Sequence, residues 1–347
     1  MNLTTTRLLS QQLAGSNLET PEEVVDWMGA MQAQDLSSFP WAVGIRMKRP
    51  SLQAVTDAFN RGTIVRSHLF RATWQLATAA DLRWMLDLCR TRNRRIISGY
   101  SKAVGDGLTE DDFLRSDALI AEITSGRPSI RCSELAQELT LRGCNFDRHQ
   151  LTHVLARAEI DGVICSGDLT RGERSFAFLE DKIPPGPALD EEEAMMLAAR
   201  KFFRSHAPAT VADFCWWTGL PLQACRRAVA ALADELTPVR QQDETFYVHA
   251  ESRTRGFRRG AAALVPSFDE YIIGYKSRQV VLDPDFAMQA YNRFGYFKPV
   301  VVQDGVVVGT WKQQSGGRIE AIDFHGQLIP AEVIGQAYAR LTAFLRS

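Results

Sequence analysis

The chain has 347 residues, of which 45% are hydrophobic and 23% charged, and its formal net charge is −1. This composition predicts a globular protein with a sizeable core, divided into two or three compact units. No apolar run approaches the roughly 20 residues that span a bilayer, and the N-terminus lacks the apolar core of a signal peptide. We therefore expect no membrane association and a cytoplasmic location.

Charge is distributed unevenly along the chain. Residues 1–105 carry five more basic than acidic side chains, residues 106–195 carry ten more acidic ones, and the remainder carries four more basic ones. An acidic middle with basic flanks leaves room for a nucleic-acid-binding face on a nearly neutral protein. The six cysteines and six histidines are dispersed without metal-type spacing, so we expect no metal and no cofactor.

The first predicted unit covers residues 1–105. Thr20, Pro21 and Glu23 form a capping-box pattern that begins an amphipathic helix. Gln32 and Gln34 are expected where this helix ends. The elements expected next are a helix over residues 51–60, a pair of strands or a strand and a bend within 63–78, and a helix over 79–99.

Two further units, residues 106–183 and 188–250, follow a common plan. Each contains two short helices joined by a turn, and a strand hairpin follows. This order is typical of a winged helix, whose second helix enters the major groove of DNA. The first unit fits the same plan more loosely, so we predict three tandem winged-helix units. The linker "DKIPPGPALDEEE" marks the clearest boundary.

The last predicted unit covers residues 258–347. Strands are expected in "AALVPSFDEYIIGY", "KPVVVQDGVVVGTW" and "GGRIEAIDFH", and a helix closes the chain. The Asp-Gly pair between valine runs is a strong hairpin signal. The predicted fold class is therefore α+β, with three winged-helix units followed by a C-terminal β-rich domain.

Basic side chains occur in four places where DNA phosphates could be bound. These places are the expected strands of the first unit, the run "RTRNRR", the expected wing of the second unit and the segment "FDEYIIGYKSR". The alternatives are a solvated helix end for the run and a salt-bridged strand end for the last segment. The candidate DNA-binding residues are Arg66, Arg71, Arg92, Arg94, Arg95, Arg171, Arg174, Lys276 and Arg278.

Two carboxamides and a carboxylate, Gln32, Gln34 and Asp35, lie within four residues of each other. On its own this cluster is explained by a polar helix end. The sequence offers no GxSxG nucleophile and no phosphate-binding glycine loop. The cluster therefore remains as the candidate for unusual chemistry.

Four blocks, "MGAMQAQD…PWAVGIR", "VRSHLFRATWQLATAADLRWML", "FDEYIIGYKSR" and "KPVVVQDGVVVGTWK", together resemble the bacterial winged-helix DNA glycosylases of the AlkZ/YcaQ superfamily. The resemblance extends over nearly the whole chain and implies a C-shaped clamp around duplex DNA. Gln32-Ala33-Gln34 matches the Gln-x-Gln motif of the AlkZ-like branch, which implies that Gln32 and Gln34 are catalytic. Gln75 stands where many relatives have histidine, and Gln75 and Asp35 are supporting candidates.

The implied reaction is hydrolysis of the N-glycosidic bond of an alkylated purine in duplex DNA, as in base excision repair. A purine alkylated at N7 or N3 is cationic and already a good leaving group. Two carboxamide oxygens that orient one water toward C1′ can then suffice. The resemblance implies bulky or crosslinked lesions and a role in self-resistance. The motif contains no lysine, so we expect a monofunctional enzyme, acting as a monomer.

Two alternatives remain open from the sequence. The first is a non-catalytic winged-helix DNA-binding protein or transcriptional regulator, which would bind one sequence tightly and release no base. The second is a degenerate family member that serves as a binding or scaffolding module. Gln75 keeps this alternative open, because many relatives have histidine at that position. The complete Gln-x-Gln motif favours the glycosylase.

Overall fold

The computed structural model describes residues 1–347 except 171, 187, 242, 315 and 316. The chain forms two compact units. Unit 1 comprises residues 1–55 and 195–347, and unit 2 comprises residues 56–194. Helices and small antiparallel sheets occur in both units, which confirms the predicted α+β class. Among the described residues, no helix has the length and apolar character of a bilayer span.

The N-terminal part of unit 1 places the two glutamines beyond a helix rather than at its end. Thr20 caps α2 (Pro21–Met28) in a complete capping box with Glu23, as predicted. The helix stops at Gly29, whose φ of 81° lies in the left-handed region that favours glycine. The short strand β1 (Met31–Gln32) follows, so the predicted helix is too long by one turn. The flanking helices are α1 (Leu3–Ser10) and α3 (Phe39–Gly44).

The chain returns to unit 1 along α10 and then forms a helix pair and a hairpin. These elements are α10 (Glu191–His206), α11 (Val211–Thr218), α12 (Leu222–Ala231), β7 (Leu236–Gln241) and β8 (Glu244–His249). Thr210 and Asp213 form the capping box of α11. The order expected for residues 188–250 is therefore present, and the division of the chain into three winged helices stays a prediction.

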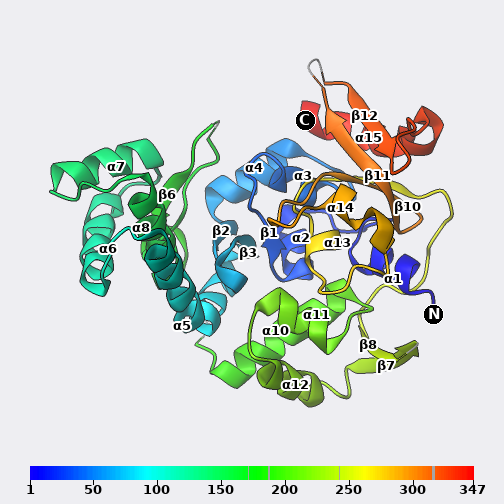
Figure 1. Ribbon diagram of the computed structural model, residues 1–347, viewed down its shortest axis with the longest axis horizontal. Coiled ribbons are helices and arrows are strands. Elements are labelled where there is room, and N and C mark those ends of the chain that lie inside the picture. The colour runs from blue at the N-terminus through cyan, green and yellow to red at the C-terminus, as the bar shows by residue number, and fades with distance from the viewer. Residues whose placement is uncertain (171, 187, 242, 315–316) are drawn as a thin grey trace. The chain divides into compact units, whose positions relative to one another are not determined.

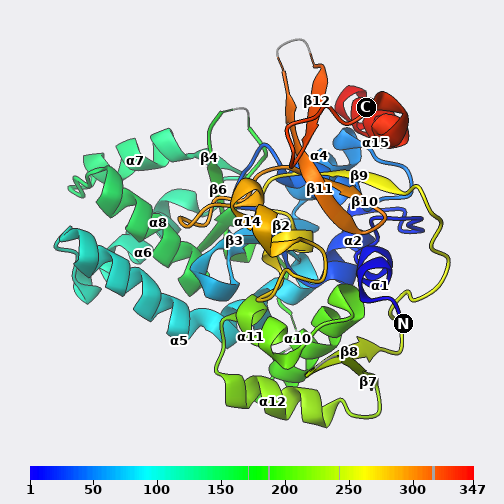
Figure 2. The ribbon, with the colours of Figure 1, turned by 45° about the vertical axis from the view of Figure 1, so that its right-hand side comes forward.

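A four-stranded antiparallel sheet with the order β12-β11-β10-β9 forms the rest of unit 1 (Figure 2). Its strands are β9 (Ala262–Val265), β10 (Val300–Gln303), β11 (Val306–Gln313) and β12 (Ile319–Asp323). Asp304 and Gly305, with φ values of 50° and 90°, form the predicted two-residue hairpin turn. The closing helix α15 (Ala331–Arg346) packs against β9.

The strand expected in "AALVPSFDEYIIGY" is present only in its first half, and the prediction is wrong for "FDEYIIGY". β9 ends at Val265, and Asp269 then caps the short helix α13 (Glu270–Ile273) by accepting a hydrogen bond from the Tyr271 amide. All four residues of α13 are buried, so the segment has no exposed face that would show helical periodicity. η2 (Pro284–Phe286) and α14 (Ala287–Ala290) complete unit 1.

Unit 2 contains the predicted strand pair, a long helix and a helical layer. α4 (Leu52–Arg61) crosses the boundary between the units. The elements that follow are β2 (Ile64–His68), η1 (Phe70–Ala72), β3 (Trp74–Thr78), α5 (Ala79–Val104), α6 (Glu110–Thr124), β4 (Ile130–Arg131), α7 (Cys132–Leu141), α8 (Arg148–Asp161), β5 (Ile164–Ser166), β6 (Ser175–Phe178) and α9 (Leu179–Lys182). β2 pairs with β3, and β6 lies between β4 and β5. An apolar core joins α6, α7 and α8.

Two carboxyl groups face each other between α6 and α8. Asp161 accepts hydrogen bonds from Arg94 and Arg157 at 2.6 and 2.7 Å. Burial raises the pKa of Asp117 to about 8, and the charge of Asp161 and a hydrogen bond between the two carboxyl groups add to the effect. Two carboxyl groups in contact share a proton. Asp117 carries it, because Asp161 has the two arginines.

This pair makes stability depend on pH in a defined direction. The folded protein keeps a proton on Asp117 that the unfolded chain loses above about pH 4, so stability falls as pH rises from about 4 toward 8. Asn cannot titrate, so the variant escapes this loss. We expect the difference in melting temperature, Asp117→Asn minus wild type, to be larger at pH 8 than at pH 5. Thermal unfolding monitored by circular dichroism at both pH values measures this. Asp111→Asn, an exposed change on the same helix, is the control, and an equal offset for Asp117→Asn at both pH values would contradict the assignment.

Candidate active site

The two glutamines of the Gln-x-Gln motif differ in exposure. Gln32 lies in β1 with 5% of its surface exposed, and Ala33 is buried at 1%. Gln34 lies in the bend that follows and is exposed. One carboxamide is therefore nearly enclosed by protein while the other is accessible to solvent. The two carboxamides therefore differ in their access to an external reactant.

Glu270 holds the backbone of β1 in place. The Gln32 amide donates a hydrogen bond of 2.7 Å to Glu270 Oε1. The glutamate is 1% exposed, and α13, which carries it, contacts β1. A charge-assisted bond between a buried carboxylate and a backbone amide is stronger than a neutral one. The position of Gln32 therefore depends on a residue 238 positions later in the chain.

His206 completes this buried arrangement. Its Nε2 lies 3.2 Å from Glu270 Oε2, and its Nδ1 lies 2.8 Å from the Ser205 hydroxyl. Burial lowers the pKa of His206, although the contact with Glu270 opposes the shift. In the neutral ring, Nε2–H donates to Glu270 and Nδ1 accepts from Ser205. A neutral histidine and a backbone amide thus supply the hydrogen bonds of the carboxylate.

Asp269, adjacent to Glu270, has a different partner. Arg46 donates to its two carboxylate oxygens at 2.7 Å each, and both side chains are buried. Arg46 also binds the Gln11 backbone and side-chain oxygens, while Gln11 Nε2 donates to the Glu270 carbonyl at 3.2 Å. The two consecutive carboxylates are thereby connected to α1 and to the end of α3.

Asp35 builds the turn after the motif. Its oxygens accept hydrogen bonds from the Ser37 amide at 2.8 Å, the Ser37 and Ser38 hydroxyls at 2.7 Å each, and the Ser267 hydroxyl at 3.2 Å. Burial raises the pKa of Asp35, but these hydrogen bonds outweigh it and the net shift is downward. These contacts place Asp35 as the cap of a turn, and its supporting role in catalysis stays a prediction.

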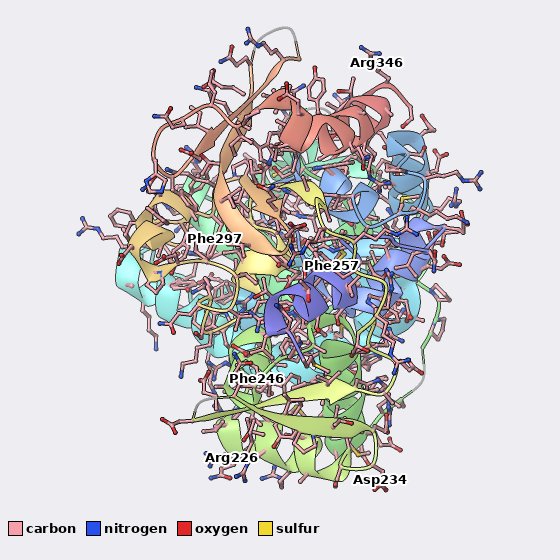
Figure 3. All side chains as sticks on the ribbon, turned by 90° about the vertical axis from the view of Figure 1, so that its right-hand side faces the viewer. Arg226, Asp234, Phe246, Phe257, Phe297 and Arg346 are labelled. Atoms are coloured by element: carbon pink, nitrogen blue, oxygen red, sulfur yellow. The ribbon has the colours of Figure 1, made fainter. Side chains whose placement is uncertain are left out.

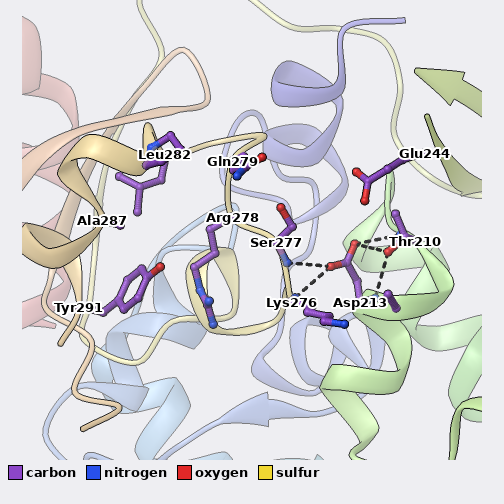
Figure 4. Close-up of a pocket in the computed structure, with 12 residues that line it drawn as sticks. Thr210, Asp213, Glu244, Lys276, Ser277, Arg278, Gln279, Leu282, Ala287 and Tyr291 are labelled. Carbon is purple, nitrogen blue, oxygen red and sulfur yellow. Dashed lines mark hydrogen bonds between the residues drawn. The ribbon is translucent and has the colours of Figure 1, made fainter. Parts of the chain in front are cut away.

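Lys276 and Arg278 line a cavity of about 380 Å³ in unit 1 (Figure 4). Lys276 is exposed, and its backbone amide donates to Asp213. Arg278 lies over the rings of Tyr291 and Phe297 at 4.8 and 5.2 Å, and burial lowers its pKa. Lys276 is therefore accessible to solvent, whereas Arg278 packs among aromatic rings.

The candidates on the strand pair of unit 2 are mostly enclosed. Arg66 is 3% exposed and lies over the Trp74 ring at 4.6 Å. Arg71 has a left-handed φ of 62° and is partly buried. Gln75 is fully buried, and its carboxamide has no hydrogen-bond partner among the described residues.

The arginines of the run "RTRNRR" on α5 and of the expected wing differ in exposure. Some are exposed, and others contact neighbouring side chains. Arg92 and Arg95 are exposed, while Arg94 pairs with Asp161. Arg174 lies over the Trp74 ring at 5.0 Å. Arg171 lies outside the residues that the structure describes. Arg92 and Arg95 thus retain the accessibility that phosphate binding requires.

Sequence reasoning missed two groups of buried polar residues. His206 had no recognisable local signal, and Glu270 was noted only as half of an acidic pair. In unit 2, Glu159 accepts hydrogen bonds from His68 at 2.5 Å and from Trp74 at 3.0 Å. Both groups join residues at least 64 positions apart, which local spacing cannot reveal. Within the described part of the chain, no group of three His, Cys, Asp or Glu side chains could hold a metal ion.

Comparison with known proteins places this geometry in a family. The family model described as DNA glycosylase AlkZ-like matches residues 25–344. An interstrand DNA cross-link repair glycosylase of Streptomyces sahachiroi is 23% identical over 328 residues, covering 88% of this chain and 85% of that protein. The solved structure of the Streptomyces sahachiroi DNA glycosylase AlkZ matches with a TM-score of 0.80 and 21% identity, over 99% of this chain and 95% of that one.

The structural match at this identity shows a shared fold. The family model spans nearly the whole chain and confirms the resemblance that the four sequence blocks carry. The chain therefore belongs to the AlkZ-like DNA glycosylase family.

Proposed function

We propose that the protein hydrolyses the N-glycosidic bond of cationic, N7- or N3-alkylated purines in duplex DNA. The observation that carries the proposal is the paired carboxamide site of unit 1. Gln34 is exposed, Gln32 is held by Glu270, and both belong to a chain of the AlkZ-like family. Each carboxamide oxygen can accept one hydrogen bond from a water molecule and fix its direction toward C1′.

The chemistry of the lesion explains why carboxamides suffice. Alkylation gives the purine a positive charge, so the base departs without protonation and leaves an oxocarbenium-like sugar. The site then has to orient water and stabilise positive charge, which is electrostatic and positional work. Normal purines are neutral leaving groups and need a general acid. The two carboxamides offer none, which protects undamaged DNA.

Bulky and crosslinked adducts are the proposed substrates. The relative from Streptomyces sahachiroi is named an interstrand DNA cross-link repair glycosylase. Gln34 lies on an exposed bend rather than in a deep pocket, which favours attack on a lesion that stays largely outside the protein. An enzyme of this kind has less need of a tight pocket for a flipped base.

The experiment that tests this proposal incubates the protein with duplexes carrying N7-methylguanine, a bulky N7 adduct or an interstrand crosslink. Alkali then reveals abasic sites as strand breaks. We expect breaks that depend on the lesion and on alkali, because the motif lacks the lysine of a glycosylase that also cleaves the strand. Tight binding to one sequence without base release would instead favour the transcriptional regulator.

The two glutamines are expected to act as a unit. Gln32→Ala and Gln34→Ala should each lower the single-turnover rate of N7-methylguanine release by about a hundredfold or more, because either change leaves the water held at one point. Duplex affinity should change little. Gln327→Ala, an exposed glutamine in a turn of unit 1, is the matched control. Native release rates in both motif variants would exclude the mechanism.

Glu270 is a positioning residue in this proposal, since it reaches the reaction only through the Gln32 amide. Glu270→Gln retains an acceptor oxygen but removes the charge that Gln32 and His206 bind. We expect the single-turnover rate to fall about ten- to a hundredfold, with less than about a threefold change in duplex affinity.

Asp269→Asn is the matched control for Glu270→Gln. It alters the neighbouring buried carboxylate, which binds Arg46 instead of Gln32. We expect this variant to lose about 3–5 kcal/mol of stability and to retain more of the release rate than Glu270→Gln. A release rate that follows the loss of stability in both variants would give Glu270 a structural role alone.

A further inference from the structure

A second cavity in unit 1, of about 710 Å³, contains four arginines. Three of them come from the segment "RTRGFRR", which joins β8 to β9, and the fourth comes from α15. In the ribbon views this yellow segment follows the outer edge of unit 1, and Figure 3 labels Phe257, which belongs to the segment. The volume falls within the range of about 300–1,000 Å³ that is usual for ligand sites.

Arg253 and Arg340 anchor the cavity wall. Arg253 Nη1 donates to Gln12 Oε1 and to the Ala14 carbonyl at 3.1 and 3.0 Å. Arg340 Nη2 donates to the carbonyls of Ile45 and Met47 at 3.3 and 2.9 Å. All four acceptors are neutral, so they fix the two guanidinium groups without balancing their charge.

The described residues that line the cavity include no carboxylate, and the Asp304 carboxylate beside it accepts hydrogen bonds from the amides of Gly260 and Ala261. Burial lowers the pKa of both Arg253 and Arg340, and no acidic neighbour offsets the shift. Arg258 and Arg259 are exposed and add two more positive charges to the same cavity. An anion bound among these guanidinium groups would offset the cost of burying the charges of Arg253 and Arg340.

We propose that this four-arginine cavity is a phosphate-binding site, separate from the Gln-x-Gln site. A guanidinium presents a planar fork of donors that matches the oxygens of a phosphate, and arginine is favoured wherever phosphate is bound bidentately. The phosphate belongs either to the DNA backbone or to a small phosphorylated molecule. Neither Gln32 nor Gln34 lines the cavity, so the assignment does not rest on the proposed reaction.

Calorimetric titration with inorganic pyrophosphate tests the site directly. Arg258→Gln combined with Arg259→Gln leaves the two anchoring guanidinium groups in place, so folding is preserved. We expect this double variant to bind pyrophosphate at least about tenfold more weakly than wild type. Arg255→Gln is the matched control, because Arg255 is exposed on the same segment but does not line the cavity, and its affinity should stay within about twofold.

An undamaged duplex titrated at several salt concentrations identifies the source of the phosphate. If the DNA backbone is the ligand, the double variant loses duplex affinity, its salt dependence becomes shallower than that of Arg255→Gln, and pyrophosphate competes with the duplex. If a small molecule is the ligand, duplex binding is unchanged and pyrophosphate does not compete. Both outcomes support the site, and neither involves base release. Equal pyrophosphate affinity in wild type and the double variant, or no measurable binding to wild type, would overturn it.

Discussion

Unit 1 depends on two consecutive carboxylates, Asp269 and Glu270, that are buried away from water. Moving an unpaired carboxylate into a protein interior costs several kcal/mol, so each must meet donors in fixed positions. Asp269 meets the guanidinium of Arg46, and Glu270 meets the Gln32 amide and His206. The constraint brings together the end of α3, strand β1 and helix α10, which are distant in the sequence. Displacing any one of these partners would leave a buried negative charge exposed to an apolar surrounding.

The two carboxylates differ in what balances their charge. Asp269 and Arg46 form an ion pair that is neutral as a whole. The hydrogen-bond partners of Glu270 are a backbone amide and a histidine whose pKa burial lowers, so neither cancels its charge. Arg7 is a further buried cation in this cluster, because its charge acts on His206 and, together with that of Glu270, on Tyr275. The charges of Arg46 and Arg7 therefore oppose those of Asp269 and Glu270 within one buried cluster.

Local chemistry was readable from the sequence, and long-range pairing was not. The capping box at Thr20 and the turn at Asp304 depend on neighbouring residues, so their patterns identified them. The helix boundary at Gly29 was missed because the apolar periodicity continues to Met31. The strand expected at residues 269–275 was wrong because a fully buried short helix shows no periodicity. The glutamines were located through family resemblance, whereas Glu270, which binds the Gln32 amide, lies 238 residues away from it.

The charge arrangement also accounts for the neutrality of the motif. A carboxylate at position 32 would add a second negative charge close to Glu270, because the backbone amide of residue 32 already donates a hydrogen bond to the Glu270 carboxylate. Like charges in contact raise one pKa until a proton is shared, and a shared proton would leave the site less able to hold water in one orientation. Carboxamides avoid this conflict. In the proposed mechanism the orienting groups remain neutral, so the site has no strong base that could act on normal nucleotides.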